Sequence, residues 1–201
     1  RTDRFSWITI DGTRLTREQA IDRFEALTGP RSENRLWADS VVKTLRDLGQ
    51  EAGLHATTSG TTGPPKQFTI PRTDLVASAL LTACTFNLEH GDRVLHCLPS
   101  DFIAGKMMLV RGFVLGLDLH VIDPRVSVLA HLRTEDRFRF AAMVPLQLHR
   151  ALQEDRARVE AQFEIILLGG GPVSEAMIHD VLGLRTKVFI GYGSTEMVTH
   201  V

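Results

Sequence analysis

Two short segments of the chain concentrate side chains that could bind phosphate and a metal ion. Residues 58–66 read Thr-Ser-Gly-Thr-Thr-Gly-Pro-Pro-Lys, and residues 192–196 read Tyr-Gly-Ser-Thr-Glu. Glycine lets the backbone approach phosphate oxygens closely, while hydroxyls and a lysine ammonium donate charge-assisted hydrogen bonds to them. A carboxylate such as Glu196 is the hard oxygen ligand that Mg²⁺ prefers. Together the two segments predict a site for the triphosphate of ATP and its magnesium ion.

The first segment differs from the common phosphate-binding P-loop. That loop needs Gly-x-x-x-x-Gly-Lys followed by Ser or Thr, whereas Gly60 and Gly63 are closer together and two prolines precede Lys66. A Walker-type NTPase is therefore disfavoured. The structural alternative is an ordinary Ser/Thr/Gly surface turn between two strands. The segment holds many hydrogen-bond donors and ends in a lysine, which favours phosphate binding.

The order and the wide separation of these segments resemble the adenylate-forming superfamily, also called the ANL or AMP-binding superfamily. Its members include acyl-CoA synthetases, aryl-CoA ligases, luciferases and the adenylation domains of peptide synthetases. A third element agrees with it, because Gly169-Gly170-Gly171-Pro172 follows an apolar run and resembles the glycine-rich turn that lies beside the adenine in this superfamily. The plain alternative for these glycines is a flexible connection between a strand and a helix.

A narrower likeness is to the o-succinylbenzoate-CoA ligases of menaquinone synthesis, over most of the chain from Leu54 onward. The residues that carry it are Cys97-Leu98-Pro99, residues 102–108, Arg111, residues 143–147 and Thr199-His200. Three alternatives stay open: another aryl- or acyl-CoA synthetase, an adenylation domain, and a non-catalytic nucleotide-binding module. Against an adenylation domain for an α-amino acid, the sequence offers no clear aspartate for the ammonium group.

The resemblance implies roles for individual residues in an acid–thiol ligase that uses ATP, Mg²⁺ and CoA. Lys66, Thr195 and Glu196 would be catalytic, with Glu196 as the metal ligand. The nucleotide would be held by Thr58, Ser59, Gly60, Thr61, Thr62, Gly63, Lys66, Gly169, Gly170, Gly171, Tyr192, Gly193 and Thr195.

The acyl pocket is assigned to Phe102, Ile103, Gly105, Lys106 and His200. The first three could equally be ordinary core at the start of a helix. Lys106 lies within an apolar run, and o-succinylbenzoate has a second carboxylate that needs a cation or a helix N-terminus near it. The hypothesis is that Lys106 helps to hold this carboxylate, with a solvated surface charge as the alternative for Lys106 and for Arg111.

Composition excludes several other classes of function. The chain has 201 residues, 43% of them hydrophobic, and a net charge of -1, which is typical of a globular domain and gives no electrostatic footprint for nucleic acid. No apolar run is long enough for a membrane span, and the start lacks the apolar stretch of a secretion signal, so a cytoplasmic location is expected. Cys84 and Cys97 are expected to be buried thiols, with no zinc or disulfide pattern around them.

The pattern of apolar residues predicts an α/β fold. Residues 1–53 are expected to form a hairpin around Asp11-Gly12 and a helical lead, with Thr16 and Gln19 as a capping box. Residues 54–201 alternate short apolar runs with helical patterns, which predicts a largely parallel sheet with flanking helices and ligands beyond the carboxyl ends of its strands. Thr73 is expected to cap one of these helices.

The resemblance also implies elements that would follow Glu196: an aspartate for the ribose, a hinge, and a small C-terminal domain with a catalytic lysine. The sequence stops five residues after Glu196. The expectation is therefore a partial N-terminal domain of the adenylate-forming fold, as a fragment of a longer ligase or as a shortened relative, with little turnover by itself.

Overall fold

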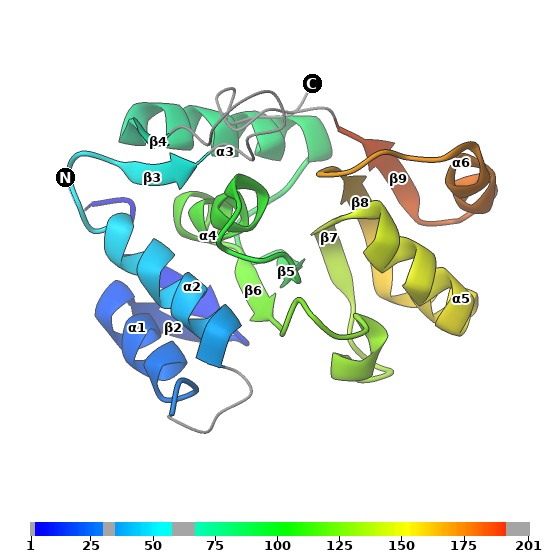
Figure 1. Ribbon diagram of the computed structural model, residues 1–201, viewed down its shortest axis with the longest axis horizontal. Helices are drawn as coiled ribbons and strands as arrows, with labels where there is room; N and C mark the ends of the chain where they lie inside the picture. The colour runs from blue at the N-terminus through cyan, green and yellow to red at the C-terminus, as the bar shows by residue number, and fades with distance from the viewer. Residues whose placement is uncertain (1–2, 30–34, 58–66, 192–201) are drawn as a thin grey trace.

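A computed structural model describes residues 3–29, 35–57 and 67–191 of the chain. Two sheets are present in these residues (Figure 1). The larger sheet has the strand order β2-β1-β6-β5-β7-β8-β9, formed by Thr13–Thr16, Trp7–Ile10, Asp118–Val121, Arg93–His96, Phe138–Met143, Phe163–Leu168 and Lys187–Ile190 in that order. The smaller sheet pairs β3 (Leu54–Thr57) with β4 (Gln67–Ile70) in antiparallel fashion.

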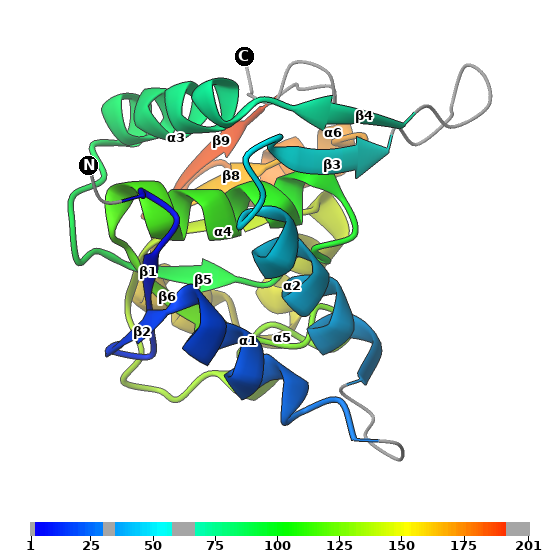
Figure 2. The ribbon, with the colours of Figure 1, turned by 90° about the vertical axis from the view of Figure 1, so that its left-hand side faces the viewer.

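Helices cover the larger sheet on both faces. The α-helices are α1 (Arg17–Glu25), α2 (Arg35–Asp47), α3 (Arg72–Phe86), α4 (Ile103–Leu115), α5 (Pro145–Gln162) and α6 (Glu175–Val181), with a short 3-10 turn η1 at Leu129–His131. In Figure 1, α1 to α4 lie on one side of the sheet, and α5 and α6 lie on the other. Figure 2 shows α4 running along the sheet with α3 and the β3–β4 hairpin beyond it.

Two apolar cores result from the alternation of side chains along the strands. Val94, Phe140 and Ile165 face the core under α1 to α4, while the next residue of each strand faces the core under α5. Strands buried on both faces read as continuous apolar runs, which is why their periodicity looks unlike that of a surface strand. The predicted α/β class with a largely parallel sheet and flanking helices is confirmed.

The chain reverses direction across the sheet at β5. From β5 it passes through α4 to β6 on one side, and then to β7 on the other side of β5, where β7 and β5 pair in parallel. The loops that follow β5 and β7 therefore leave the sheet in opposite directions. In open parallel sheets, ligands bind in the crevice at such a switch point, beyond the carboxyl ends of the strands.

The N-terminal hairpin joins the same sheet as the later strands. Asp11 and Gly12 have φ values of 50° and 73°, as a tight two-residue hairpin turn requires. The predicted capping box of α1 is present, since Gln19 donates its backbone N–H to the Thr16 hydroxyl and accepts the Thr16 N–H. β1 pairs in parallel with β6. The division of the chain at residue 53 stays a prediction.

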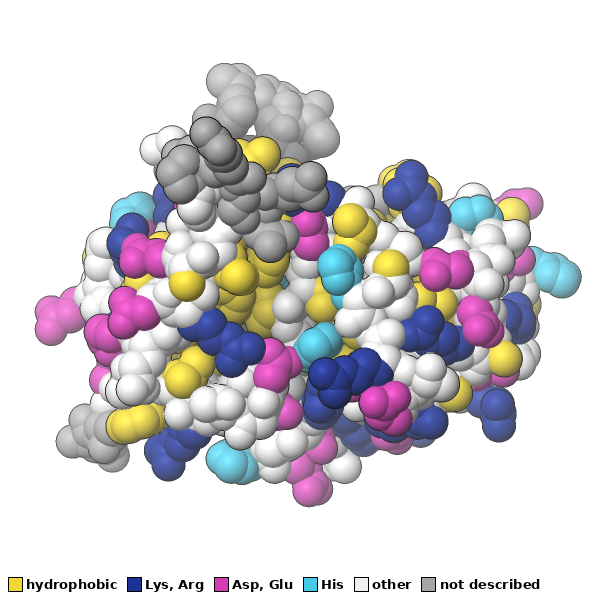
Figure 3. Space-filling model, turned by 90° about the horizontal axis from the view of Figure 1, so that it is seen from below, with side chains coloured by type: hydrophobic (Ala, Val, Ile, Leu, Met, Phe, Trp, Pro, Cys, Tyr) yellow, Lys and Arg dark blue, Asp and Glu magenta, His cyan; other side chains and the backbone are white. Residues whose placement is uncertain are grey.

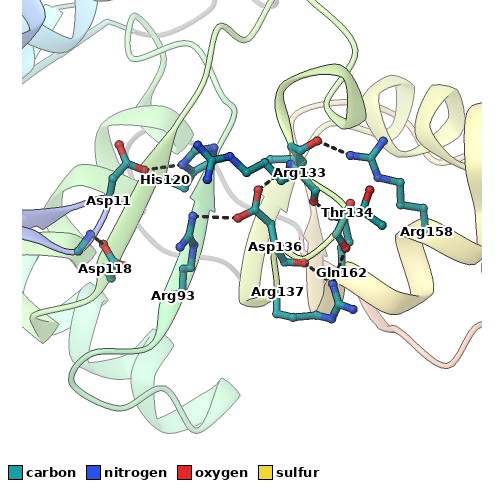
Figure 4. Close-up of polar contacts among 12 residues, drawn as sticks. Asp11, Arg93, Asp118, His120, Arg133, Thr134, Asp136, Arg137, Arg158 and Gln162 are labelled. Atoms are coloured by element: carbon teal, nitrogen blue, oxygen red, sulfur yellow. Dashed lines mark hydrogen bonds and ion pairs between the residues drawn. The ribbon is translucent and has the colours of Figure 1, made fainter.

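A polar network lies where the hairpin meets the sheet (Figure 4). The carboxylate of Asp11 is 2.5 Å from Nδ1 of His120, and Arg93 forms an ion pair with Asp136 at 3.1 Å. The Asp118 carboxylate accepts the backbone N–H of Gly12 at 2.8 Å. These contacts link β1, β5, β6 and the loop before β7, so their role is structural.

Two local predictions are wrong. Pro71, not Thr73, occupies the N-cap of α3, and the Thr73 hydroxyl donates instead to the Asp74 carboxylate at 3.1 Å. The fixed φ of proline suits a helix start, which moves the boundary by two residues. Cys97 is buried as expected, but Cys84 is exposed because it lies on the outer side of α3.

Surface features agree with the composition. Among the residues that the structure describes, none of the helices is long and apolar enough to cross a bilayer. Figure 3 shows acidic and basic side chains intermixed over the face seen from below.

Candidate active site

The carboxyl edge of the large sheet gathers the loops that the sequence singles out. Gly169 donates its N–H to the carbonyl of Met143, which is the last residue of β7, at 3.1 Å. Gly191 donates its N–H to the carbonyl of Leu168, which is the last residue of β8, at 2.8 Å. Three successive strand ends are therefore joined, and the glycine turn lies between β7 and β9.

Gln147 joins this group to β5 across the switch point. Its side-chain amide donates to the carbonyl of Cys97 at 2.6 Å, and its side-chain oxygen accepts the backbone N–H of Val144 at 3.1 Å. Because Pro145 fixes the first turn of α5, Gln147 stands one turn into the helix with its amide between the two strand ends. The carboxyl ends of β5 and β7 are thus joined through one side chain.

The glycine turn leaves bare backbone at this edge. Gly170 has a φ of +73°, which favours glycine. Added Cβ atoms at Gly169 and Gly171 would meet nothing nearer than 3.7 Å and 3.6 Å, so packing among the described residues does not require glycine at these two positions. The turn is largely exposed. Room beside an exposed backbone is what a ligand that approaches it closely would need.

Most of the predicted nucleotide and metal ligands lie outside the described residues. They are Thr58, Ser59, Gly60, Thr61, Thr62, Gly63, Lys66, Tyr192, Gly193, Thr195 and Glu196, and the predicted pocket residue His200 joins them. Their attachment points are described. Residues 58–66 connect β3 to β4, and Tyr192 follows Gly191, whose N–H contacts the end of β8 beside the glycine turn.

The predicted acyl-pocket residues lie at the start of α4, directly after β5. Phe102 is the N-cap of α4 and is 60% exposed, while Ile103 is partly buried against the core. Packing alone requires a glycine at position 105, because an added Cβ on Gly105 would lie 2.2 Å from the carbonyl oxygen of Pro99. Of these residues, Phe102 offers the most apolar surface at the carboxyl edge.

Lys106 is buried, contrary to the alternative of a solvated surface charge. It is 6% exposed, and its ammonium donates to the carbonyl of His55 in β3 at 2.7 Å. Burial lowers the pKa of Lys106, and the nearby carboxylate of Asp47 acts in the opposite direction. A buried ammonium is costly unless it is hydrogen-bonded, and the carbonyl supplies that bond.

Arg111 is also buried rather than solvated, deeper in the same helix. Its Nε donates to the Thr82 hydroxyl of α3 at 3.2 Å, and burial lowers its pKa to about 10. It lies in the α3–α4 contact, two turns into the helix and so away from the carboxyl edge. Its described contacts fit a structural role.

His96, the last residue of β5, is buried beside the candidate site. It is 1% exposed, and its Nε2 lies 3.0 Å from the Ser100 hydroxyl, which places the pair under the loop that leads into α4. Nδ1 of His96 has no hydrogen-bond partner among the described residues. Burial lowers the pKa of His96 from 6.5 to about 4, so the ring is neutral near pH 7.

This pKa predicts a stability that depends on pH. The unfolded chain binds a proton at His96 near pH 6.5, and the folded chain only near pH 4. The stability that the neutral, buried His96 contributes to the fold is therefore complete above pH 6.5 and is lost as pH falls toward 4. The loss amounts to about 3 kcal/mol in the free energy of unfolding. Urea unfolding of His96→Gln between pH 4 and 7 should show a flatter profile than the unsubstituted protein. The exposed His179→Gln is the control, and equal slopes for all three proteins would contradict the assignment.

Comparison with known proteins decides the family. A family model described as "AMP-binding enzyme" matches residues 54–201, which is more than half of the chain. The chain belongs to the AMP-binding enzyme family. A probable 2-succinylbenzoate–CoA ligase of Mycobacterium tuberculosis is 30% identical over 168 residues, covering 79% of this chain and 43% of the relative. The 2-succinylbenzoate–CoA ligase of Bacillus subtilis is 30% identical over 145 residues, covering 72% of this chain and 30% of the relative.

Solved structures give the same result for the AMP-binding fold. An acyl-CoA synthetase (AMP-forming)/AMP-acid ligase II-like protein from Dyadobacter fermentans superposes with a TM-score of 0.70 and 37% identity, covering 89% of this chain and 50% of that chain. The o-succinylbenzoate coenzyme A synthetase from Bacillus subtilis, in complex with ATP and magnesium ion, superposes with a TM-score of 0.64 and 26% identity, covering 76% of this chain and 32% of that chain. The chain spans less than half the length of these curated relatives.

The contacts of two residues near the candidate site could not be read from the sequence. Gln147 was visible only as part of a resemblance, although its place three residues after Val144, with proline between, is a helix-start signal. No sequence pattern points to Asp47, because its carboxylate approaches β3 through a contact between distant residues, at 3.4 Å from Nδ1 of His55.

Proposed function

We propose that this chain serves in an ATP-dependent acid–CoA ligase that forms an acyl-adenylate, with 2-succinylbenzoate as the acid. The observation that carries the proposal is the chain of hydrogen bonds that joins Gly191, the glycine turn and the start of α5 along the carboxyl edge of the sheet, up to the switch point between β5 and β7, in a member of the AMP-binding family. Two relatives named for this ligase activity, and a solved relative in complex with ATP and magnesium ion, support it.

The nucleotide would lie across the carboxyl edge of the sheet. The adenine would lie against the exposed backbone of Gly169 to Gly171, with Tyr192 and Gly193 following β9 beside it. The hydroxyls and glycines of residues 58–66, together with Lys66, would bind the β and γ phosphates, and Thr195 the α phosphate. Bound Mg²⁺, with Glu196 as its protein ligand, would neutralise charge on the phosphates.

The acid would lie beyond the ends of β5 and β7. Phe102 and Leu146, at the starts of α4 and α5, are 60% and 55% exposed, and such apolar side chains suit an aromatic acid. His200 would line the same pocket. An assignment of Lys106 to the second carboxylate requires its ammonium to serve the acid in addition to the carbonyl that it already binds.

The proposed reaction has two steps. In the first, an oxygen of the substrate carboxylate attacks the α-phosphorus of ATP, and pyrophosphate leaves with its bonding electron pair. In the second, the thiol of CoA attacks the acyl carbon, loses its proton and displaces AMP. The protein lowers the first barrier by aligning the reactants and by stabilising charge on the phosphates with preorganised donors.

Acid-dependent ATP–pyrophosphate exchange tests the proposal. The full-length gene product is assayed with Mg²⁺ and a panel of acids: 2-succinylbenzoate, benzoate, a medium-chain fatty acid and several α-amino acids. Exchange that depends on 2-succinylbenzoate and is lost with EDTA is expected. Exchange with another acid would redirect the assignment within the family, and ATP binding without exchange for any acid would indicate a non-catalytic nucleotide-binding module.

A further inference from the structure

We propose that Lys106 is a positioning residue for the nucleotide, acting through strand β3 rather than by contact with the acid. The inference rests on the proposed function, because it concerns the segment that would bind the ATP phosphates. It replaces the role in acid recognition that the sequence suggests for this lysine.

The carbonyl that Lys106 binds belongs to the strand that leads into that segment. His55 is the second residue of β3, and β3 ends at Thr57, directly before residues 58–66. In the small sheet, β3 has β4 as its partner, and His55 is paired with Thr69. The other edge of β3 has no strand beside it among the described residues, so a carbonyl there needs a donor from elsewhere. Lys106 supplies this donor at 2.7 Å.

Lys106 is buried where it makes this contact. It stands in the first turns of α4 with 6% of its surface exposed, and it comes from the helix that follows β5 at the switch point. A charge-assisted hydrogen bond of this length is roughly twice as strong as a neutral one. The bond therefore ties the strand before the phosphate segment to the helix that begins beside the candidate acid pocket.

A second contact acts on the same residue of β3 from another helix. Nδ1 of His55 lies 3.4 Å from a carboxylate oxygen of Asp47, which is the last residue of α2 and is 8% exposed. The backbone of His55 is thus bound to α4, and its ring lies beside the last residue of α2. Among the described residues, the one strand that pairs with β3 is β4, which is the second strand of the same hairpin.

Steady-state kinetics of Lys106→Met in the full-length gene product test the proposal. With pyrophosphate exchange as the readout, we expect the KM for ATP to rise about tenfold, while the KM for 2-succinylbenzoate changes less than about twofold. Lys106→Arg, which keeps a charged donor, should bring the KM for ATP back to within about threefold of the unsubstituted value. Lys187→Met is the matched control, because Lys187 is exposed at the amino end of β9, and it should change neither KM.

The alternatives give different results. A rise in the KM for the acid with an unchanged KM for ATP would overturn the proposal and return Lys106 to acid recognition. Equal rises in both values, or no rescue by Lys106→Arg, would also overturn it. If Lys106→Met does not fold, Lys106→Gln, which keeps only a neutral donor, provides the test, with a rise of about threefold in the KM for ATP alone expected and no change contradicting it. Absence of exchange in the unsubstituted protein would instead reject the proposed function.

Discussion

Replacing Gly53 with alanine should lower the free energy of unfolding by about 4 kcal/mol, from two separate costs. Gly53 directly precedes β3 and has a φ of +112°, a conformation that residues with a Cβ rarely adopt. An added Cβ would also lie 2.0 Å from the carbonyl oxygen of Ile70, at the base of the β3–β4 hairpin. Because the oxygen belongs to the backbone and the position of a Cβ is fixed by its own backbone, the clash can be relieved only by moving a strand.

Gly91→Ala separates these two costs. Gly91 has a φ of +86°, but an added Cβ there would meet no atom within 4 Å. We expect Gly91→Ala to lose only about 1 to 2 kcal/mol in urea unfolding at neutral pH. Equal losses for the two variants would show that close packing at the base of the hairpin contributes nothing.

Replacing Glu196 with glutamine should reduce kcat for acid-dependent pyrophosphate exchange about 100- to 1000-fold. Under the proposed function, Glu196 is the protein ligand of Mg²⁺, and a neutral amide oxygen is a much weaker ligand than a carboxylate. The apparent affinity for Mg²⁺ should fall at the same time, so that raising the Mg²⁺ concentration restores part of the activity. The measurement is a series of exchange rates over a range of Mg²⁺ concentrations.

Glu51→Gln is the control for the loss of one negative charge, because Glu51 is exposed in the turn after α2. Its exchange rate and Mg²⁺ dependence should match those of the unsubstituted protein. A loss of less than about threefold in Glu196→Gln would contradict its role as the metal ligand.

Much of the secondary structure was predictable because it depends on local signals. Asp11-Gly12 between two extended runs gave the first hairpin, and Thr16 with Gln19 gave the start of α1. The apolar runs of β7 and β8 gave buried strands. Thr73 shows the limit of such signals, since Pro71, two residues earlier, competes for the same helix start.

The parts of the site that could not be predicted depend on contacts between distant residues. The sequence places Lys106 in an apolar run, but 51 positions separate it from His55, and no local pattern names that carbonyl as its partner. The same holds for Gln147 and Cys97, which are 50 positions apart. Strand order decides these contacts, and it follows from the packing of the whole sheet rather than from any one segment.

An experimental structure of the full-length gene product with Mg²⁺ and a non-hydrolysable ATP analogue would test the proposed site. We expect the adenine at residues 169–171, Lys66 on the terminal phosphates, and the carboxylate of Glu196 within about 2.1 Å of the metal. A nucleotide bound elsewhere, or Lys66 and Glu196 facing different sides of the molecule, would contradict it.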